Sequence, residues 1–322
     1  MNELRPAIPG EWPSDGLENV HSCPICQKDE RSILYEEMED KLFFCAPGKW
    51  TLYGCTSCGA AYLDPRPTPE TIGLAYSSYY THGSQRPTIL PQATNTKKWV
   101  SAILKNSYLN FRYGISLAET PKLPKWMFKI VYFTLPIRST LDRWVRHLQP
   151  PVAHSRLLEV GCGNGYFLQI AKLIGWHVTG IDVDSAAVEN ARKLGVDAFE
   201  SSVYHMPFEN DAFDIVTMNH VIEHLHDPGA ALAEMLRILK PGGILWIGTP
   251  NLNSKAHSNA GSKWIGLDPP RHLVMFDQHS LMLAFTRAGF PDPVRRRVAW
   301  TDRGDWELIV TAQKPANPCR PC

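Results

Sequence analysis

The sequence predicts an α/β protein whose main unit is a mostly parallel sheet of seven strands that ends in an antiparallel hairpin. From about residue 152 onward, short apolar runs alternate with segments of helical periodicity, as in a parallel sheet with crossover helices. The last two apolar runs have no helical segment between them, which predicts the hairpin. Two CxxC pairs near the N-terminus indicate a smaller unit ahead of the sheet.

The elements of the sheet unit follow from these runs. We expect strands at 156–160, 177–181, 197–200, 213–219 and 244–248, and hairpin strands at 294–299 and 306–312. We expect helices at 165–174, 185–193, 228–239 and 279–288.

The chain divides into four parts by composition. Residues 1–80 hold the two CxxC pairs with β-like runs at 41–45 and 50–53; residues 81–150 are basic and aromatic; residues 151–316 form the sheet unit; and residues 317–322 form a tail. Prolines 121, 124 and 136 should divide the second part into short helices, which we interpret as a lid or linker.

The charge distribution restricts the partners. A net charge of +1 argues against a broad nucleic-acid-binding surface. Between Arg86 and Arg146, however, eleven lysines and arginines face two acids, Glu119 and Asp142. This segment is compatible with a solvated lid, an acceptor pocket, or peripheral membrane contact through 97–146. With neither a signal-peptide pattern nor an apolar run of membrane-spanning length, we expect a cytoplasmic protein.

A glycine-rich turn follows the first strand of the sheet unit. The run Leu157–Gly165 reads LLEVGCGNG, a buried strand that leads into a GxGxG turn and then a helix. Glycines let the backbone turn sharply and approach a ligand closely, and a helix N-terminus offers free N–H groups. The turn predicts a ligand site, although such turns also occur as simple tight loops.

The second strand of the sheet adds a carboxylate at the same edge. It closes on Asp182, which is placed to accept hydrogen bonds from both hydroxyls of a ribose. We favour Asp182 over Asp184 for this role, because Asp184 stands where it would cap the helix that starts at Ser185.

Four motifs in order, LLEVGCGNG, VTGIDVD, MPFENDAFDIV and LKPGGILWIGTPN, resemble the class I S-adenosylmethionine-dependent methyltransferases. The resemblance covers about half the chain and implies a Rossmann-like sheet. It also implies that the methionine part of S-adenosylmethionine lies over the glycine turn, with Asp182 on the ribose and Val183 beside the adenine. Ser202 and Val203 stand where the family often has an acid for the adenine amine. The expected cofactor-binding residues are Glu159, Gly161, Cys162, Gly163, Asn164, Gly165, Asp182, Val183, Ser202, Val203, Asn219 and His220.

The cysteine pairs predict a metal site. Cys23, Cys26, Cys55 and Cys58 supply four thiolates from two tight turns, enough for a tetrahedral Zn²⁺ with no open position, so the zinc should be structural. The segment after Cys58 resembles the subset of these methyltransferases that carries an N-terminal four-cysteine zinc domain. Members of that subset often act on sugars, lipids or secondary metabolites. A third pair, Cys319 and Cys322, is expected to be a bystander.

Two segments should line the methyl acceptor. His220 ends the fourth strand and is a candidate base, or a packing residue against the cofactor; Glu223 and His224 follow it at spacings that could hold a metal or form a polar pocket wall. Arg271 could clamp an anionic group and His272 could act as base, unless Arg271 pairs with Asp268 to fix its loop. The expected catalytic residues are therefore His220, Glu223, Arg271 and His272.

The sequence thus predicts methyl transfer from S-adenosylmethionine to a small-molecule, glycan or lipid-linked acceptor, with oxygen as the preferred acceptor atom. Carbon and nitrogen acceptors remain open. The alternatives are a zinc-containing ribosomal RNA methyltransferase, which the near-neutral net charge counts against and the basic segment keeps open, and a cofactor-binding regulatory protein without turnover. The sequence does not predict an oligomeric state.

Overall fold

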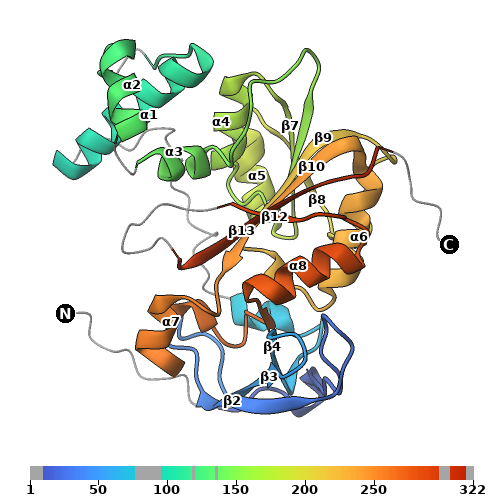
Figure 1. Cartoon of the computed structure of the whole chain (residues 1–322). Coiled ribbons are helices and arrows are strands. Elements are labelled where there is room, and N and C mark those ends of the chain that lie inside the picture. Colours follow the sequence, from blue (N-terminus) through green and yellow to red (C-terminus); the bar gives the residue numbers. More distant parts are fainter. Residues whose placement is uncertain (1–9, 77–95, 118–119, 135–136, 297–304, 317–322) are drawn as a thin grey trace.

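The computed structural model describes residues 10–76, 96–117, 120–134, 137–296 and 305–316. The sheet unit lies in the middle, with a small β unit at one end and two helices, α1 (Thr96–Tyr113) and α2 (Lys125–Thr134), at the other (Figure 1). Cys319 and Cys322, residues 81–95 and part of the expected strand 294–299 lie outside the described residues.

The central sheet has seven strands in the order β12-β13-β10-β9-β6-β7-β8. Strand β13 is antiparallel to both neighbours, whereas β6 to β10 run parallel, which confirms the predicted fold class. Reading along the chain, the strands are β6 (Arg156–Val160), β7 (His177–Asp182), β8 (Asp197–Glu200), β9 (Phe213–Asn219), β10 (Leu239–Pro250), β12 (Val294–Arg295) and β13 (Glu307–Gln313).

Helices cover both faces of this sheet. Leu157 and Leu158 are neighbours in β6 but belong to different apolar cores, because successive side chains of a strand point to opposite faces. The helices of the unit are α4 (Tyr166–Ile174), α5 (Ser185–Lys193), α6 (Pro228–Ile238), α7 (Lys255–Ala260) and α8 (Gln278–Arg287). Short 3₁₀ helices lie at η4 (Ile222–His224), η5 (Gly261–Lys263) and η6 (Ile265–Leu267).

The N-terminal β unit is joined to the sheet unit by a shared sheet. Its four strands are ordered β11-β4-β3-β2, and β11 (Val274–Met275) comes from the segment that follows β10. A backbone hydrogen bond of 3.1 Å from Leu63 to the Leu273 carbonyl extends this junction. The other elements are η1 (Ser14–Gly16), β1 (Leu17–Glu18), β2 (Arg31–Met38), β3 (Trp50–Cys55), β4 (Ala61–Leu63), β5 (Arg66–Pro67) and η2 (Ile72–Tyr76).

The expected strand at 41–45 is wrong. This segment is a bend around Asp40, whose carboxylate accepts hydrogen bonds from the backbone N–H groups of the residues that follow, including Phe43 at 3.0 Å and Cys45 at 2.9 Å. Side chains of aspartate that bind the following backbone in this way favour turns over strands. Strand β3 pairs with β2, which precedes the bend, and with β4 on its other side.

The described part of the basic aromatic segment forms three helices: α1 (Thr96–Tyr113), α2 (Lys125–Thr134) and α3 (Arg138–Trp144). Asp142 in α3 accepts hydrogen bonds from Tyr108 at 2.6 Å and Tyr132 at 3.0 Å, so one carboxylate ties all three together. Among the residues described, no helix is long and apolar enough to cross a bilayer.

Candidate active site

The glycine turn has positive φ angles at its three glycines, as its sequence predicts. Gly161, Gly163 and Gly165 have φ angles of +68°, +50° and +77°, a region that favours glycine. A Cβ on Gly161 would collide with Val221, so the segment after β9 lies directly on the turn. A Cβ on Gly163 would meet no described atom within 4 Å, so this part of the turn faces open space. The turn therefore leaves room for a ligand beside residues 219–226.

Asp182 lies at the end of β7, beside this turn. One of its carboxylate oxygens accepts a hydrogen bond of 2.8 Å from the Gly163 N–H, and the other accepts one of 3.0 Å from the Asp184 N–H. Burial raises the pKa of Asp182, an effect opposed by these backbone donors. Asp184 caps α5 by accepting a hydrogen bond of 2.9 Å from Ala186. The two aspartates therefore face different partners, and Asp182 is the one on the glycine turn.

Glu159 lies in β6 just before the turn and is paired with Arg146, which follows α3. The guanidinium of Arg146 forms an ion pair with Oε1 of Glu159, donates to Thr217 at 2.8 Å and stacks 3.8 Å from the ring centre of Phe167. Burial raises the pKa of Glu159 to about 7, and Arg146 opposes this rise. Oε2 of Glu159 is buried and has no hydrogen-bond partner among the described residues. A buried carboxylate oxygen without a donor indicates a place for a ligand cation.

These residues fit S-adenosylmethionine. Glu159 offers an acceptor for its ammonium group, the open face of Gly163 gives it room, and Asp182 offers two oxygens for ribose hydroxyls. Val183 next to Asp182 is 76% exposed, an apolar surface that an adenine ring can cover. Among the other expected contacts, Val203 is buried and Ser202 is exposed, with its hydroxyl 3.3 Å from the Tyr204 N–H. Cys162 is buried, whereas Asn164 and Asn219 are partly exposed.

His220 follows Asn219 at the end of β9 and is held by two buried carboxylates. Its Nδ1 lies 3.1 Å from Oε1 of Glu223, and its Nε2 lies 3.3 Å from Oε1 of Glu307 at the start of β13. Burial lowers the pKa of His220, but the two carboxylates outweigh it and raise the pKa to about 10. His220 is therefore an imidazolium at neutral pH, and this argues against the expected role as a base.

Glu223 connects His220 to two further histidines. It is fully buried and accepts a hydrogen bond of 2.9 Å from Thr249, and Nε2 of His272 lies 4.0 Å from its Oε1. The rings of His224 and His272 meet edge to face with centroids 4.6 Å apart. Glu223, His224 and His272 place ligand-type atoms within 4.8 Å of one another, so the structure brings three polar residues from two segments together.

The orientation of His272 is set by the backbone. Its Nδ1 lies 2.8 Å from the carbonyl oxygen of Gly266, which can only accept, so Nδ1 carries a proton and, in the neutral ring, Nε2 has the lone pair. Burial lowers the pKa of His224 to about 4, and its Nδ1 lies 3.0 Å from the Arg271 carbonyl oxygen and 2.9 Å from the hydroxyl of Tyr76. Neutral imidazole is therefore available from His224.

Arg271 lies at the junction of the N-terminal β unit and the sheet unit. Its side chain has no exposed surface, and its guanidinium forms paired hydrogen bonds with Asp268 and with Asp40 of the N-terminal unit, at 2.6 and 3.0 Å in each case. A further bond of 3.0 Å reaches the Ala75 carbonyl. Because its donors are taken by protein groups, the structure assigns Arg271 to the junction of the two units rather than to an anionic substrate.

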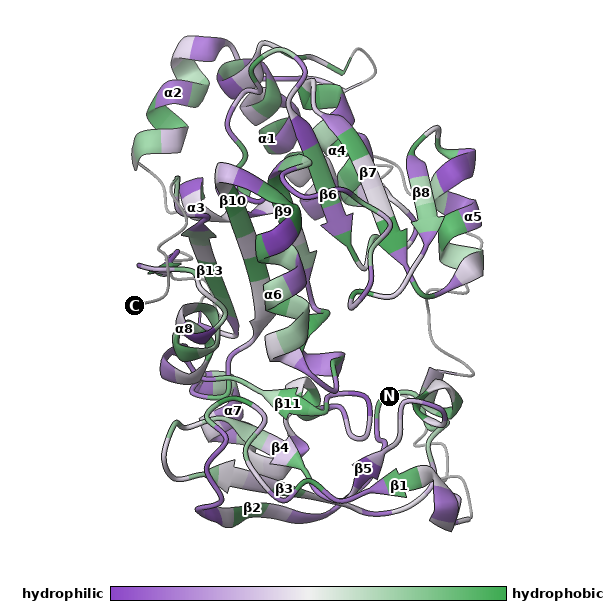
Figure 2. Cartoon of the chain, turned by 90° about the vertical axis from the view of Figure 1, so that its right-hand side faces the viewer, coloured by the Kyte–Doolittle hydropathy of each residue, from purple (hydrophilic) through white to green (hydrophobic). Residues whose placement is uncertain are grey.

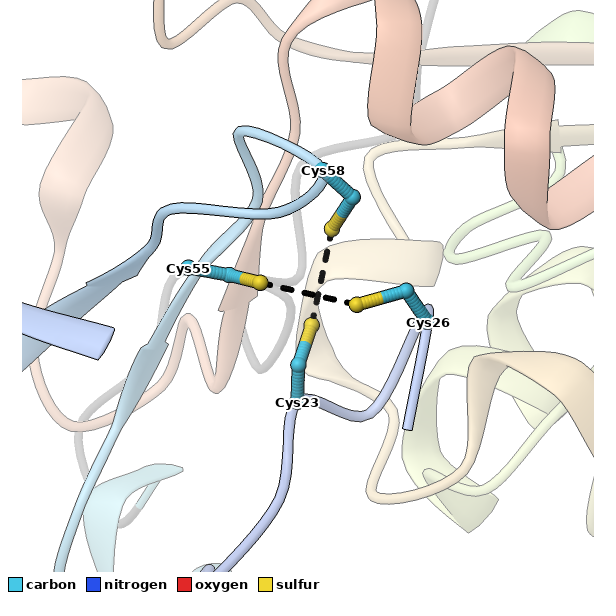
Figure 3. A group of neighbouring side chains, drawn as sticks. All are labelled: Cys23, Cys26, Cys55 and Cys58. Carbon is cyan, nitrogen blue, oxygen red and sulfur yellow. Dashed lines mark hydrogen bonds between the residues drawn. The ribbon is translucent and has the colours of Figure 1, made fainter. Parts of the chain in front are cut away.

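The four expected zinc ligands converge (Figure 3). The sulfur atoms of Cys23 and Cys58 lie 3.6 Å apart and those of Cys26 and Cys55 lie 3.5 Å apart. Four sulfurs at a Zn–S distance of about 2.3 Å in a tetrahedron are roughly 3.8 Å apart, so the cluster fits one zinc ion. Each pair is held in a tight turn, as in the 2.9 Å hydrogen bond from Gln27 to the Cys23 carbonyl and the 3.0 Å bond from Gly59 to the Cys55 carbonyl.

Comparison with known proteins decides the type of domain. Residues 135–292 match the profile of a family described as "Methyltransferase domain". This match covers just under half of the chain, so residues 135–292 are similar to a methyltransferase domain. A ubiquinone biosynthesis O-methyltransferase of Thiobacillus denitrificans is 32% identical over 42% of this chain and 59% of its own length. A malonyl-[acyl-carrier protein] O-methyltransferase of Yersinia pestis is 28% identical over 43% of this chain and 56% of its own length.

The chain therefore spans less than two thirds of the length of these curated relatives. Among solved structures, a SAM-dependent methyltransferase from Archaeoglobus fulgidus aligns with 59% of this chain and 99% of its own length, at 17% identity and a TM-score of 0.45.

Several residues around the methyltransferase site were missed from the sequence. Arg146 and Arg143 were counted only as part of a basic segment, yet they pair with Glu159 and Glu307. Asp40 was missed as the partner of Arg271. A signal was present for Glu307, because an acid at the start of an otherwise apolar strand is unusual unless it is paired. The others pair across long sequence separations that local patterns do not reveal.

Proposed function

We propose that this chain transfers a methyl group from S-adenosylmethionine to an oxygen of a small-molecule, glycan or lipid-linked acceptor. The observation that carries the proposal is the pairing of Nε2 of His272 with Glu223, whose segment lies against the glycine turn through Val221. The relatives named as O-methyltransferases of a ubiquinone pathway and of malonyl-[acyl-carrier protein] support oxygen as the acceptor atom.

The cofactor, when bound, supplies a methyl group on a sulfonium that is already a good leaving group. The residues of the chain bind and orient it. Glu159 would accept from the ammonium group through Oε2, which has no partner among the described residues, Asp182 would accept from the ribose hydroxyls, and Val183 would pack beside the adenine. Holding the donor in one orientation accounts for much of the catalysis, because an in-line displacement depends on geometry.

His272 acts as the general base in this proposal. Its protonated Nδ1 is fixed on the Gly266 carbonyl, so Nε2 is free to take the proton of an acceptor hydroxyl as the oxygen attacks the methyl. The carboxylate of Glu223, 4.0 Å from Nε2, stabilises the imidazolium that forms. General base catalysis of this kind contributes about 10²- to 10⁴-fold in rate.

His220 acts as a positioning residue. As an imidazolium between Glu223 and Glu307, it fixes the Glu223 carboxylate beside His272 and balances part of the buried negative charge. Arg143 adds a second cation on Glu307. The carboxylate of Glu223 is therefore held in place by His220 while it faces His272.

The experiment uses His272→Asn, which keeps an amide N–H for Gly266 but removes Nε2. Tritiated S-adenosylmethionine is incubated with catechols, glycans and a lipid extract, and methylated products are identified by mass spectrometry. We expect turnover of the accepted compound to fall about 100-fold with unchanged cofactor affinity. His226→Asn is the control, since His226 contacts the Pro67 carbonyl instead. Equal turnover in His272→Asn, or a product methylated at carbon or nitrogen, would overturn the proposal.

We also propose that the four thiolates hold one structural Zn²⁺. The sulfur geometry and the absence of a fifth protein group at the four-cysteine cluster in the described part of the chain support a closed site. Elemental analysis of protein purified without chelator should give one zinc per chain, and Cys58→Ser should lower that ratio well below one. A metal-free wild-type protein that is fully folded would contradict this assignment.

A further inference from the structure

We propose that the exposed face of α2 docks the chain onto the surface of an anionic lipid bilayer. This inference goes beyond the proposed methyl transfer and does not depend on it. It rests on three observations about α2: an exposed apolar stripe, a buried opposite side that fixes its orientation, and surrounding lysines.

The exposed stripe runs along one side of the helix. Trp126, Ile130 and Phe133 are 67%, 56% and 59% exposed, and their spacing of four and three residues places them on one face. Met127 beside them is 38% exposed. Figures 1 and 2 place α2 at the end of the molecule away from the N-terminal β unit, so this face is remote from the zinc cluster. Large apolar side chains gathered on one exposed face indicate an interaction site.

The other side of α2 is locked into the protein. Phe128 is fully buried and packs on the ring of Phe111 at 5.7 Å and on the ring of Tyr132 at 6.0 Å. Tyr132 donates a hydrogen bond of 3.0 Å to Asp142. The helix therefore cannot rotate to bury Trp126 and Phe133 without breaking this packing, and the exposed stripe is a built feature of the fold.

The charge around the stripe is positive. Lys125 and Lys129 lie on α2 itself, Lys122 precedes it, and all three are exposed. Residues 96–134 contain seven lysines and arginines against one acid, Glu119. The guanidinium of Arg138 lies 5.8 Å from the ring centre of Phe133. Cations beside an apolar stripe complement a surface of anionic headgroups over acyl chains.

A bilayer fits this face better than a nucleic acid does. An aromatic and basic surface can also stack bases, but Ile130 lies between Trp126 and Phe133 along the helix and offers a base no stacking partner. At about 15 Å, a ten-residue helix is too short to cross a bilayer and suited to lie in its interface. Tryptophan and lysine are the residues that anchor such helices, the first in the headgroup region and the second by extending its amine outward.

The experiment is co-sedimentation of the full chain with vesicles. Vesicles of phosphatidylcholine with about one third phosphatidylserine should pellet the wild type, and phosphatidylcholine alone should pellet it at least tenfold less. The double variant Trp126→Ser, Phe133→Ser should bind the anionic vesicles at least tenfold less, while its affinity for S-adenosylmethionine stays unchanged. Ile33→Ser, which removes a side chain that is 51% exposed in the N-terminal unit, is the matched control and should bind normally.

Two results would overturn the proposal. One is equal pelleting of the wild type and the double variant with anionic vesicles. The other is binding of an unstructured RNA, falling steeply with salt, in a protein that does not pellet with either vesicle, because this would make the basic face a nucleic-acid surface. Failure of the methyltransferase assay with normal vesicle binding would leave this inference intact, so the two proposals fail separately.

Discussion

Arg271 and Arg146 are both buried arginines that pair with carboxylates, yet their surroundings differ. Arg271 makes paired hydrogen bonds to Asp40 and Asp268, a closed arrangement between two units of the chain. Arg146 pairs with one oxygen of Glu159 and leaves the other without a partner among the described residues. Both arginines lie in segments where an acceptor site is expected. Only the Arg146 pair leaves a carboxylate oxygen, Oε2 of Glu159, available to a ligand.

The pKa values reflect this difference. Burial would raise the pKa of Asp40, but hydrogen bonds from Arg271 and the backbone hold it well below its usual range. Burial dominates at Glu159 and raises its pKa to about 7 despite Arg146. A fully compensated charge serves stability, whereas a carboxyl group poised near neutral pH can respond to a ligand.

The largest expected effect is on stability, at the closed cluster formed by Arg271, Asp40 and Asp268. Arg271→Met should lower the free energy of unfolding by about 3–5 kcal/mol, because it leaves two buried carboxylates without their cation. Urea denaturation measures the change. Lys240→Met, which breaks a partly exposed pair with Asp214, should cost at most about 1 kcal/mol. A loss at Arg271 no larger than that at Lys240 would show that the cluster does not join the units.

The affinity for S-adenosylmethionine at the open cluster, formed by Arg146 and Glu159, should depend on pH. Because the folded pKa of Glu159 is about 7, its carboxylate is mostly protonated at pH 6 and mostly charged at pH 8. Affinity for the cationic ammonium of S-adenosylmethionine should therefore rise about tenfold between these pH values. Glu159→Gln should remove most of this rise, as measured by titration calorimetry. A pH dependence that is unchanged in the variant would separate Glu159 from the cofactor.

A smaller effect concerns His220. Its pKa is raised from 6.5 to about 10, so its ion pairs stabilise the fold fully below pH 6.5 and are lost as pH rises through 10. Between pH 6.5 and 10 the free energy of unfolding of the wild type should fall by about 1 kcal/mol relative to that of His220→Gln. The change is modest because a third of the side chain is exposed. Parallel pH profiles of stability for the two proteins would mean that His220 is not held as an imidazolium.

The fold was predictable because its signals are local. The apolar runs of β6 and β9, the capping position of Asp184 and the CxxC turns can each be read within a few residues. The strand order then follows from the rules for parallel sheets. The bend at 41–45 was missed because the hydrogen bonds to Asp40 outweigh the β-forming residues there.

The candidate site was less predictable because its charges pair over long distances along the chain. His220 is expected either as a base, on its ordinary pKa, or as a packing residue against the cofactor, and the carboxylate of Glu307, 87 positions later, helps to raise that pKa. Arg271 is expected either to clamp an anionic group or to pair with Asp268; the Asp268 pair is confirmed, and Asp40, 231 positions earlier, binds Arg271 as well. A sequence pattern identifies which residues can carry chemistry, and the fold decides which of them are already occupied.

The most direct test of the account compares the two aspartates that follow β7. Titration calorimetry with S-adenosylmethionine should show one site per chain in the wild type. Asp182→Ala should weaken binding at least tenfold because the ribose hydroxyls lose their acceptor, while Asp184→Ala should only destabilise the capped helix by about 1 kcal/mol. No measurable binding by the wild type, or equal affinity in wild type and Asp182→Ala, would contradict the assignment of this turn to the cofactor.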